Sequence, residues 1–273
     1  LMLVATLLSS VLSNTGTAAC LMPVALGICA AAKIPASRQL MPLAFACGWG
    51  GVITMVGTPP NIIATGALNA AGLPTFSFFE FAWIGIPLSL AGMLYMMFIG
   101  KYLLPKVELS ADQEIAQEIE AKTTSTSKQM ISGLILLLVV VTMAIGIPGI
   151  TLEMAAVIGA IVCVLTGCLT EKQAYGSIDW VTIFLFAGMM PIATSMDKTG
   201  AGALIADWTV GLMGGTPSPM VVTAVLFLLS CTLTQFMSNT AASALLCPIG
   251  LAIAKQLGAD PKAVVMAIAV AAS

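Results

Sequence analysis

The chain has 273 residues, of which 59% are hydrophobic and only 8% are charged, and its formal net charge is −2. Soluble domains carry about 25% charged residues, so the composition excludes an ordinary soluble domain and predicts an integral membrane protein. The apolar runs are too continuous for the alternating strands of a membrane barrel. An all-α polytopic fold remains, and no basic patch points to nucleic acid.

Apolar segments of helical length follow one another along the chain. In order they are 1–12, 16–32, 40–56, 62–68, 78–100, 129–147, 151–169, about 179–196 and 218–254, with a short interfacial helix expected at 201–213. Residues 101–128 form the hydrophilic stretch, which we interpret as a connector between two halves. The segments 129–147 and 151–169 each have 19 residues, close to the length that crosses a bilayer.

The last apolar segment, 218–254, has 37 residues and cannot be one spanning helix, because it would be about 55 Å long. Two full spans would leave a second arm, 241–254, of only 14 residues. A re-entrant hairpin fits this segment better, and such backbone survives at membrane depth where it lines a cavity. Two ordinary helices joined by a tight external turn are the alternative.

The triplet Ser13-Asn14-Thr15 returns 225 residues later as Ser238-Asn239-Thr240, in a matched apolar setting. A hydroxyl stands four residues before each copy, Ser9 and Thr234, so hydroxyl and motif share a helix face. We interpret the two regions as internal repeats, each a hairpin with the triplet at its tip. Five predicted crossings separate them, and because five is odd the repeats are expected to be inverted.

The stretch Gly57-Thr58-Pro59-Pro60-Asn61 predicts a break in the helix that begins at residue 40. Pro59 and Pro60 have no N–H group, so the carbonyls of Met55 and Val56 lose their helical partners. The helix that resumes near Asn61 would present N–H groups and a positive dipole to an anion. A simple proline kink is the alternative.

The available chemistry favours cation and anion binding over catalysis. The sequence has no histidine, and its carboxylates lie in loops or at segment ends, as Glu80, Glu153 and Asp179 do. Proton-driven carriers usually need a buried titratable group, and an intramembrane hydrolase needs an aspartate or serine–histidine pair that cannot be assembled here. Hydroxyls, amides and freed carbonyls are neutral hard ligands suited to sodium.

The paired Ser-Asn-Thr hairpins, with Gly-Thr-Pro-Pro-Asn after the first, resemble the divalent anion:sodium symporter family. That family belongs to the ion-transporter superfamily of citrate- and arsenite-type carriers. The resemblance implies an elevator-type homodimer in the cell (plasma or inner) membrane that carries dicarboxylates, tricarboxylates or sulfate with sodium. A related arsenite exporter, sodium/proton antiporter or proton-coupled citrate carrier is the alternative.

The resemblance also implies site residues, carried over by position. One sodium ion would be bound by Ser9, Ser13, Asn14 and Gly57, and the other by Thr234, Ser238 and Asn239. The expected substrate contacts are Asn14, Thr15, Thr58, Pro59, Asn239 and Thr240. The family has a second proline break whose counterpart would fall beyond Ser273, so we read the chain as a fragment that lacks both ends.

The expected organisation has a transport domain and a scaffold. The ranges are 1–75 (first hairpin and broken helix, transport domain), 76–104 (spanning scaffold helix), 105–128 (cytoplasmic connector), 129–175 (two scaffold helices) and 176–273 (spanning helix, interfacial helix and truncated second hairpin, transport domain).

Overall fold

The computed structural model describes residues 1–32, 34–104, 126–145, 149, 151–178, 180–201, 204, 207, 208, 211 and 218–273. Every regular element assigned within these ranges is helical, which confirms the predicted all-α class. Lys33, most of the predicted connector 105–128, Asp179 and most of the predicted interfacial helix 201–213 lie outside the described residues.

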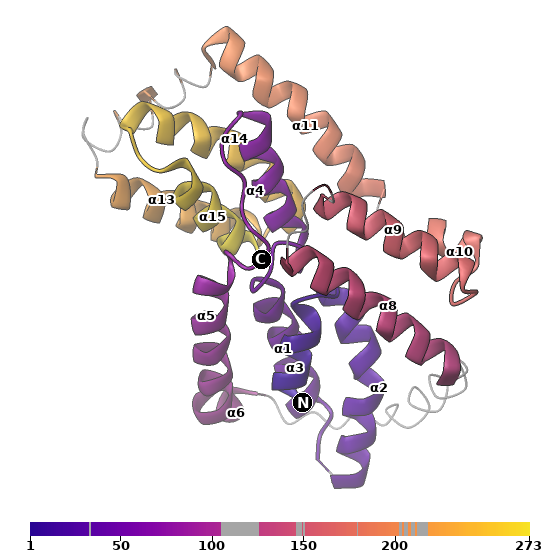
Figure 1. Cartoon of the computed structure of the whole chain (residues 1–273). Coiled ribbons are helices and arrows are strands. Elements are labelled where there is room, and N and C mark those ends of the chain that lie inside the picture. The colour runs from indigo at the N-terminus through magenta and orange to yellow at the C-terminus, as the bar shows by residue number, and fades with distance from the viewer. Residues whose placement is uncertain are drawn as a thin grey trace. The chain divides into compact units, whose positions relative to one another are not determined.

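Most described helices follow the predicted apolar segments, but the helices at Glu171–Gly176 and Pro261–Ala272 match none of them. They are α1 (Met2–Ser9), α2 (Asn14–Ala32), α3 (Ser37–Gly51), α4 (Pro59–Ala70), α5 (Ala82–Tyr95), the π-helix η1 (Met96–Gly100), α6 (Lys101–Leu103), α8 (Thr126–Ile145), α9 (Leu152–Leu165), α10 (Glu171–Gly176), α11 (Trp180–Thr199), α13 (Pro219–Leu233), α14 (Asn239–Leu257) and α15 (Pro261–Ala272). Figure 1 shows their order along the chain.

The chain forms two compact units. The first comprises residues 1–18, 44–100 and 180–273, and the second comprises residues 19–43 and 101–179. Both Ser-Asn-Thr triplets and the Gly-Thr-Pro-Pro-Asn break belong to the first unit. In the second unit α8 packs against α9, and Gly159 on α9 allows the close approach because a Cβ there would lie 2.4 Å from Val139.

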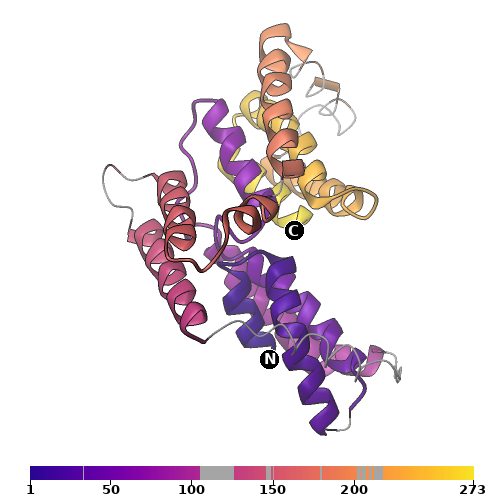
Figure 2. The ribbon, with the colours of Figure 1, turned by 90° about the vertical axis from the view of Figure 1, so that its right-hand side faces the viewer.

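In the first unit, α4, α13, α14 and α15 pack together, as Figures 1 and 2 both show. Bulky residues such as Ile268 are fully buried between them, and alanines fill the facing positions of α14 and α15. At Gly250 a Cβ would lie 2.5 Å from Ile268 Cδ1. Small residues that admit a neighbouring helix are the usual basis of packing in membranes, where lipid is as apolar as leucine.

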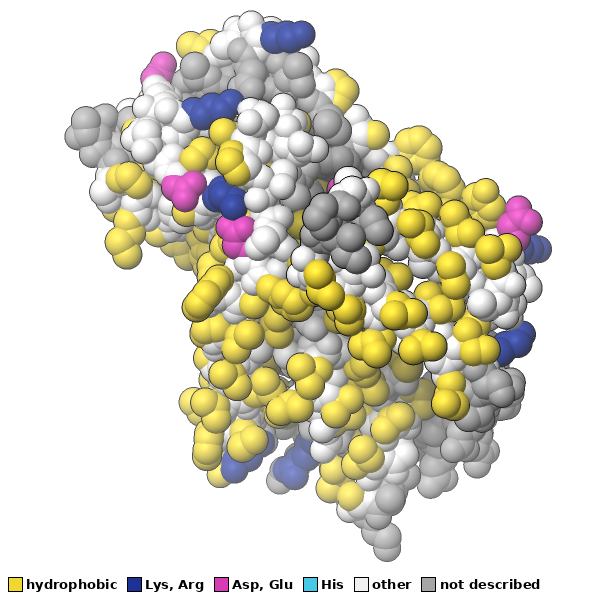
Figure 3. All heavy atoms as spheres, viewed as in Figure 1, with side chains coloured by type: hydrophobic (Ala, Val, Ile, Leu, Met, Phe, Trp, Pro, Cys, Tyr) yellow, Lys and Arg dark blue, Asp and Glu magenta, His cyan; other side chains and the backbone are white. Residues whose placement is uncertain are grey.

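Many large apolar side chains face outward. Trp83 and Phe236 are 85% exposed and Met220 is 84% exposed, and hydrophobic side chains cover broad areas of the face in Figure 3. Exposed apolar surface of this extent marks a membrane or partner surface. Two described helical stretches, Ala82–Leu103 and Asn239–Leu257, are long and apolar enough to cross a membrane.

The length of α14 corrects one expectation. The second arm was expected to cover 241–254 with 14 residues, but α14 runs from Asn239 to Leu257 and has 19. Its start is capped by Ser238, and it continues until Gly258, which adopts the left-handed conformation (φ 62°) that ends many helices. The argument for a re-entrant hairpin from a short second arm is therefore wrong.

The break after α3 is wider than expected. The helix ends at Gly51 instead of residue 56, and α4 begins at Pro59. Glycines are poor helix formers, and at Gly50 a Cβ would lie 2.4 Å from the carbonyl oxygen of Thr6, so α1 approaches the end of α3 closely. Thr58 is extended (φ −136°, ψ 149°), as the residue before proline should be.

Candidate cation and anion site

Three oxygen atoms converge beside the first Ser-Asn-Thr triplet, between α1 and α2. The Ser9 hydroxyl is fully buried and lies 2.7 Å from Asn14 Oδ1 and 2.7 Å from the carbonyl oxygen of Cys47. A hydroxyl has one proton, so it can donate to only one of these acceptors at a time. We call Ser9 Oγ, Asn14 Oδ1 and the Cys47 carbonyl oxygen the first oxygen cluster.

The second Ser-Asn-Thr triplet, between α13 and α14, repeats this arrangement. Thr234 Oγ1 lies 2.7 Å from Asn239 Oδ1 and 3.3 Å from the carbonyl oxygen of Ala272. In both copies the amide follows the hydroxyl by 5 residues and the carbonyl follows it by 38. We call these three atoms the second oxygen cluster. The internal repeat read from the sequence therefore extends to individual contacts.

Ser13 and Ser238 cap the helices that follow the tips. Ser13 Oγ accepts a hydrogen bond of 3.1 Å from the Gly16 N–H, and Ser238 Oγ accepts one of 3.1 Å from the Ala241 N–H. The caps explain why α2 and α14 start at their asparagines. Sodium binding by these serines stays a prediction.

The helix break contacts the first oxygen cluster through two glycines. A Cβ on Gly51 would lie 2.2 Å from Asn14 Oδ1 and 2.5 Å from Thr58 Cγ2. A Cβ on Gly57 would lie 2.3 Å from the carbonyl oxygen of Gly51. Gly51 therefore lies against Asn14 and Thr58, and Gly57 lies against Gly51; cation or anion binding by these residues stays a prediction.

A hydrogen bond joins the two repeats. Thr58 Oγ1 lies 2.9 Å from Ser273 Oγ, and Ser273 follows Ala272, whose carbonyl belongs to the second oxygen cluster. Thr58 is buried at the N-terminus of α4. The N-terminus of α4 is therefore linked through Ser273 and Ala272 to the second oxygen cluster, at the N-terminus of α14. Helix N-termini attract anions.

The remaining predicted residues lie beside these atoms. Thr15 and Thr240 are the second residues of α2 and α14; Thr15 is exposed and Thr240 is half-buried. Pro59 is the first residue of α4 and is half-buried. Their predicted contacts with substrate stay predictions, since they concern a bound state.

Sequence reasoning missed the backbone and amide groups that complete the site. The carbonyls of Cys47 and Ala272 are backbone groups and carry no side-chain signal. Asn61 is fully buried, and its Nδ2 donates to the Thr54 carbonyl at 2.8 Å while its Oδ1 is buried without a partner. Asn61 therefore holds the unwound segment beside the start of α4.

The site combines neutral oxygen ligands with helix N-termini inside an all-helical apolar protein, which is the organisation of a membrane transporter and not of an enzyme. A family model for citrate transporters (CitMHS) matches residues 1–271. The chain belongs to this citrate transporter family, and the resemblance to citrate-type ion transporters is confirmed.

Several relatives of this chain are also named as transporters. An uncharacterised transporter of Haemophilus influenzae is 30% identical over 100% of this chain and 61% of its own length. An uncharacterised transporter of Methanocaldococcus jannaschii is 26% identical over 97% of this chain and 60% of its own length. One from Escherichia coli is 43% identical over 41% of this chain. The chain thus spans about three fifths of the length of the two relatives that match nearly all of it.

Proposed function

We propose that the chain forms the binding core of a secondary transporter that carries small di- or tricarboxylate anions, or sulfate, together with sodium. The duplicated oxygen cluster is the observation that carries this proposal. Each cluster offers a hydroxyl, an amide oxygen and a backbone carbonyl. Neutral hard oxygens at such positions suit a hard monovalent cation better than a transition metal.

The distribution of titratable groups supports sodium over protons. Among the side chains that the structure describes, the buried polar ones are hydroxyls and the amide of Asn61, and none is acidic. A proton-coupled carrier usually stores its proton on a buried carboxylate or histidine. Cations bound at the two clusters would offset the charge of an anion held at the helix N-termini, so cation and anion would bind cooperatively.

The repeated geometry suits alternating access. In the proposed mechanism, the two repeats have inverted orientations in the membrane, and the binding core moves as a body past a scaffold within a homodimer of the cell membrane. The matched contacts of the two tips support a common origin for the repeats. The bond from Thr58 to Ser273 supports movement of both tips as one body.

Uptake by proteoliposomes tests the proposed function. We expect labelled citrate, succinate or sulfate to accumulate under an inward sodium gradient and to exchange in counterflow. A proton gradient without sodium should give little uptake, because no buried acidic side chain is present among the described residues. Equal uptake under protons alone would contradict sodium coupling and favour the proton-coupled citrate carrier.

A further inference from the structure

The segment between α4 and α5 packs tightly despite having no regular structure. Phe76, Phe78 and Phe81 are only 3%, 4% and 0% exposed, and the rings of Phe76 and Phe81 lie 4.7 Å apart. We call residues 76–81 the aromatic clip. Burial of three aromatic rings anchors the clip, because a large apolar ring is stabilised where it is removed from water.

The clip holds the unwound segment after α3. The Phe78 carbonyl accepts a hydrogen bond of 3.0 Å from the Met55 N–H, one of the backbone groups freed where the helix ends. The neighbouring Thr54 accepts from Asn61 Nδ2 through its carbonyl, and its hydroxyl donates to the Ser10 carbonyl at the first hairpin tip. The clip is thus connected to the residue after Ser9 of the first oxygen cluster.

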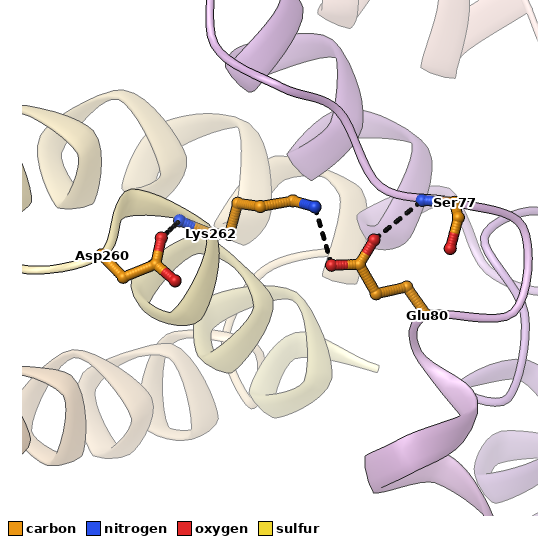
Figure 4. Close-up of polar contacts among 4 residues, drawn as sticks. All are labelled: Ser77, Glu80, Asp260 and Lys262. Carbon is orange, nitrogen blue, oxygen red and sulfur yellow. Dashed lines mark hydrogen bonds and ion pairs between the residues drawn. The ribbon is translucent and has the colours of Figure 1, made fainter.

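An ion pair ties the clip to the second repeat. Glu80 Oε1 lies 2.7 Å from Lys262 Nζ, and Glu80 Oε2 accepts a bond of 2.9 Å from the Ser77 N–H. Lys262 Nζ also lies 5.2 Å from the centre of the Phe76 ring. Figure 4 shows Glu80 between Ser77 and Lys262, with Asp260 at the start of α15.

Local preference does not explain the position of Lys262. Lys262 is the second residue of α15, where the helix dipole disfavours a positive charge. The negative charges of Asp260 and Glu80 offset this unfavourable interaction. Burial alone raises the pKa of Glu80, but the hydrogen bonds from Lys262 and the Ser77 N–H, with the Lys262 charge, outweigh it and hold the pKa below its ordinary value. Glu80 therefore remains ionised at neutral pH.

The other end of α15 carries the Ala272 carbonyl of the second oxygen cluster. A helix rises 1.5 Å per residue, so Lys262 and Ala272 are about 15 Å apart on one rigid rod. We infer that the Glu80–Lys262 ion pair is a positioning device that fixes α15 against the aromatic clip and so sets the relative position of the two oxygen clusters. The inference rests on the proposed function, which makes these clusters the cation sites.

Hydrogen exchange of the purified protein tests the positioning role without substrate or cation. In Glu80→Gln and Lys262→Met variants, amides of residues 52–58 and 268–273 should exchange about three- to tenfold faster than in the wild type. Lys262→Arg keeps the charge and should restore slow exchange. Faster exchange confined to residues 76–82 and 260–264 would show a local contact only and overturn the inference.

Transport kinetics supply the second test, under whichever cation gradient drives uptake in the wild type. Each neutral variant should raise the KM for the anion about three- to tenfold with Vmax little changed, and the double variant should be no worse than either single one because both remove one interaction. Glu171→Gln on the exposed helix α10 is the matched control and should leave KM unchanged.

An unchanged KM in the Glu80 and Lys262 variants, with a lower melting temperature, would mean that the ion pair only stabilises the fold. Loss of sodium coupling alone would refute the proposed function but not this positioning role.

Discussion

Replacing Asn14 or Asn239 by alanine is expected to abolish transport while leaving the helices intact. Each side chain places an amide oxygen 2.7 Å from the hydroxyl of its oxygen cluster. An amide can accept a cation through its oxygen and donate to an anion through its nitrogen. A bond to a charged group contributes about 1.5–3 kcal/mol, so affinity should fall about ten- to more than a hundredfold for each substitution.

Serine in place of asparagine separates ligand binding from helix capping. A capping role would tolerate serine, which caps nearly as well. The structure already assigns the caps to Ser13 and Ser238, so we expect Asn14→Ser and Asn239→Ser to lose affinity as alanine does. Substrate affinity is read from uptake, with Asn69→Ala, at an exposed position near the end of α4, as the matched control. Near wild-type affinity in both serine variants would remove the asparagines from the site.

Gly51→Ala is expected to stop transport for a different reason. The added Cβ would lie 2.2 Å from Asn14 Oδ1 and 2.5 Å from Thr58 Cγ2, which is closer than any real contact. Either Asn14 leaves the first oxygen cluster or the break shifts away from it. Overpacking of this kind costs about 1–3 kcal/mol, and because the strain falls on Asn14 itself, cation affinity should fall about tenfold or more.

Gly48→Ala is the matched control, because it lies one turn earlier on α3 and a Cβ there would meet nothing within 4 Å. Both variants change a glycine of α3 to the same residue, so they differ mainly in what the added Cβ meets. Uptake and the melting temperature in detergent should be measured for both. If Gly51→Ala transports as well as Gly48→Ala, the break does not position Asn14.

The sequence predicted those features of the fold that depend on the type of a particular side chain, such as helix starts and the helix break. The returning triplet predicted where two helices start, and the structure starts α2 and α14 at Asn14 and Asn239. Pro59 and Pro60 predicted the break, because a missing N–H group and a fixed φ act locally. The four-residue offset of Ser9 and Thr234 from the serines predicted a shared helix face, and this is wrong. Ser9 ends α1 and Thr234 follows α13, so each hydroxyl meets its asparagine across the turn between two helices.

The remaining features of the candidate site depend on tertiary contacts that no local sequence pattern encodes. The carbonyls of Cys47 and Ala272 are backbone groups, so the side chains at these two positions do not indicate that the carbonyls belong to the oxygen clusters. The early end of α3 at Gly51 reflects the approach of Asn14 and Thr58. Glu80 and Lys262 are 182 residues apart, so no local pattern pairs them, and Glu80 was read only as a charge at a segment end.

Equilibrium binding of radioactive sodium to the purified protein tests the central claim most directly. The two oxygen clusters predict two sodium ions per chain for the wild type in the presence of the anion. Ser9→Ala and Thr234→Ala each remove the hydroxyl of one cluster, so each variant should bind one ion. If the wild type binds no sodium, or if both variants bind as much as the wild type, the oxygen clusters are not the cation sites.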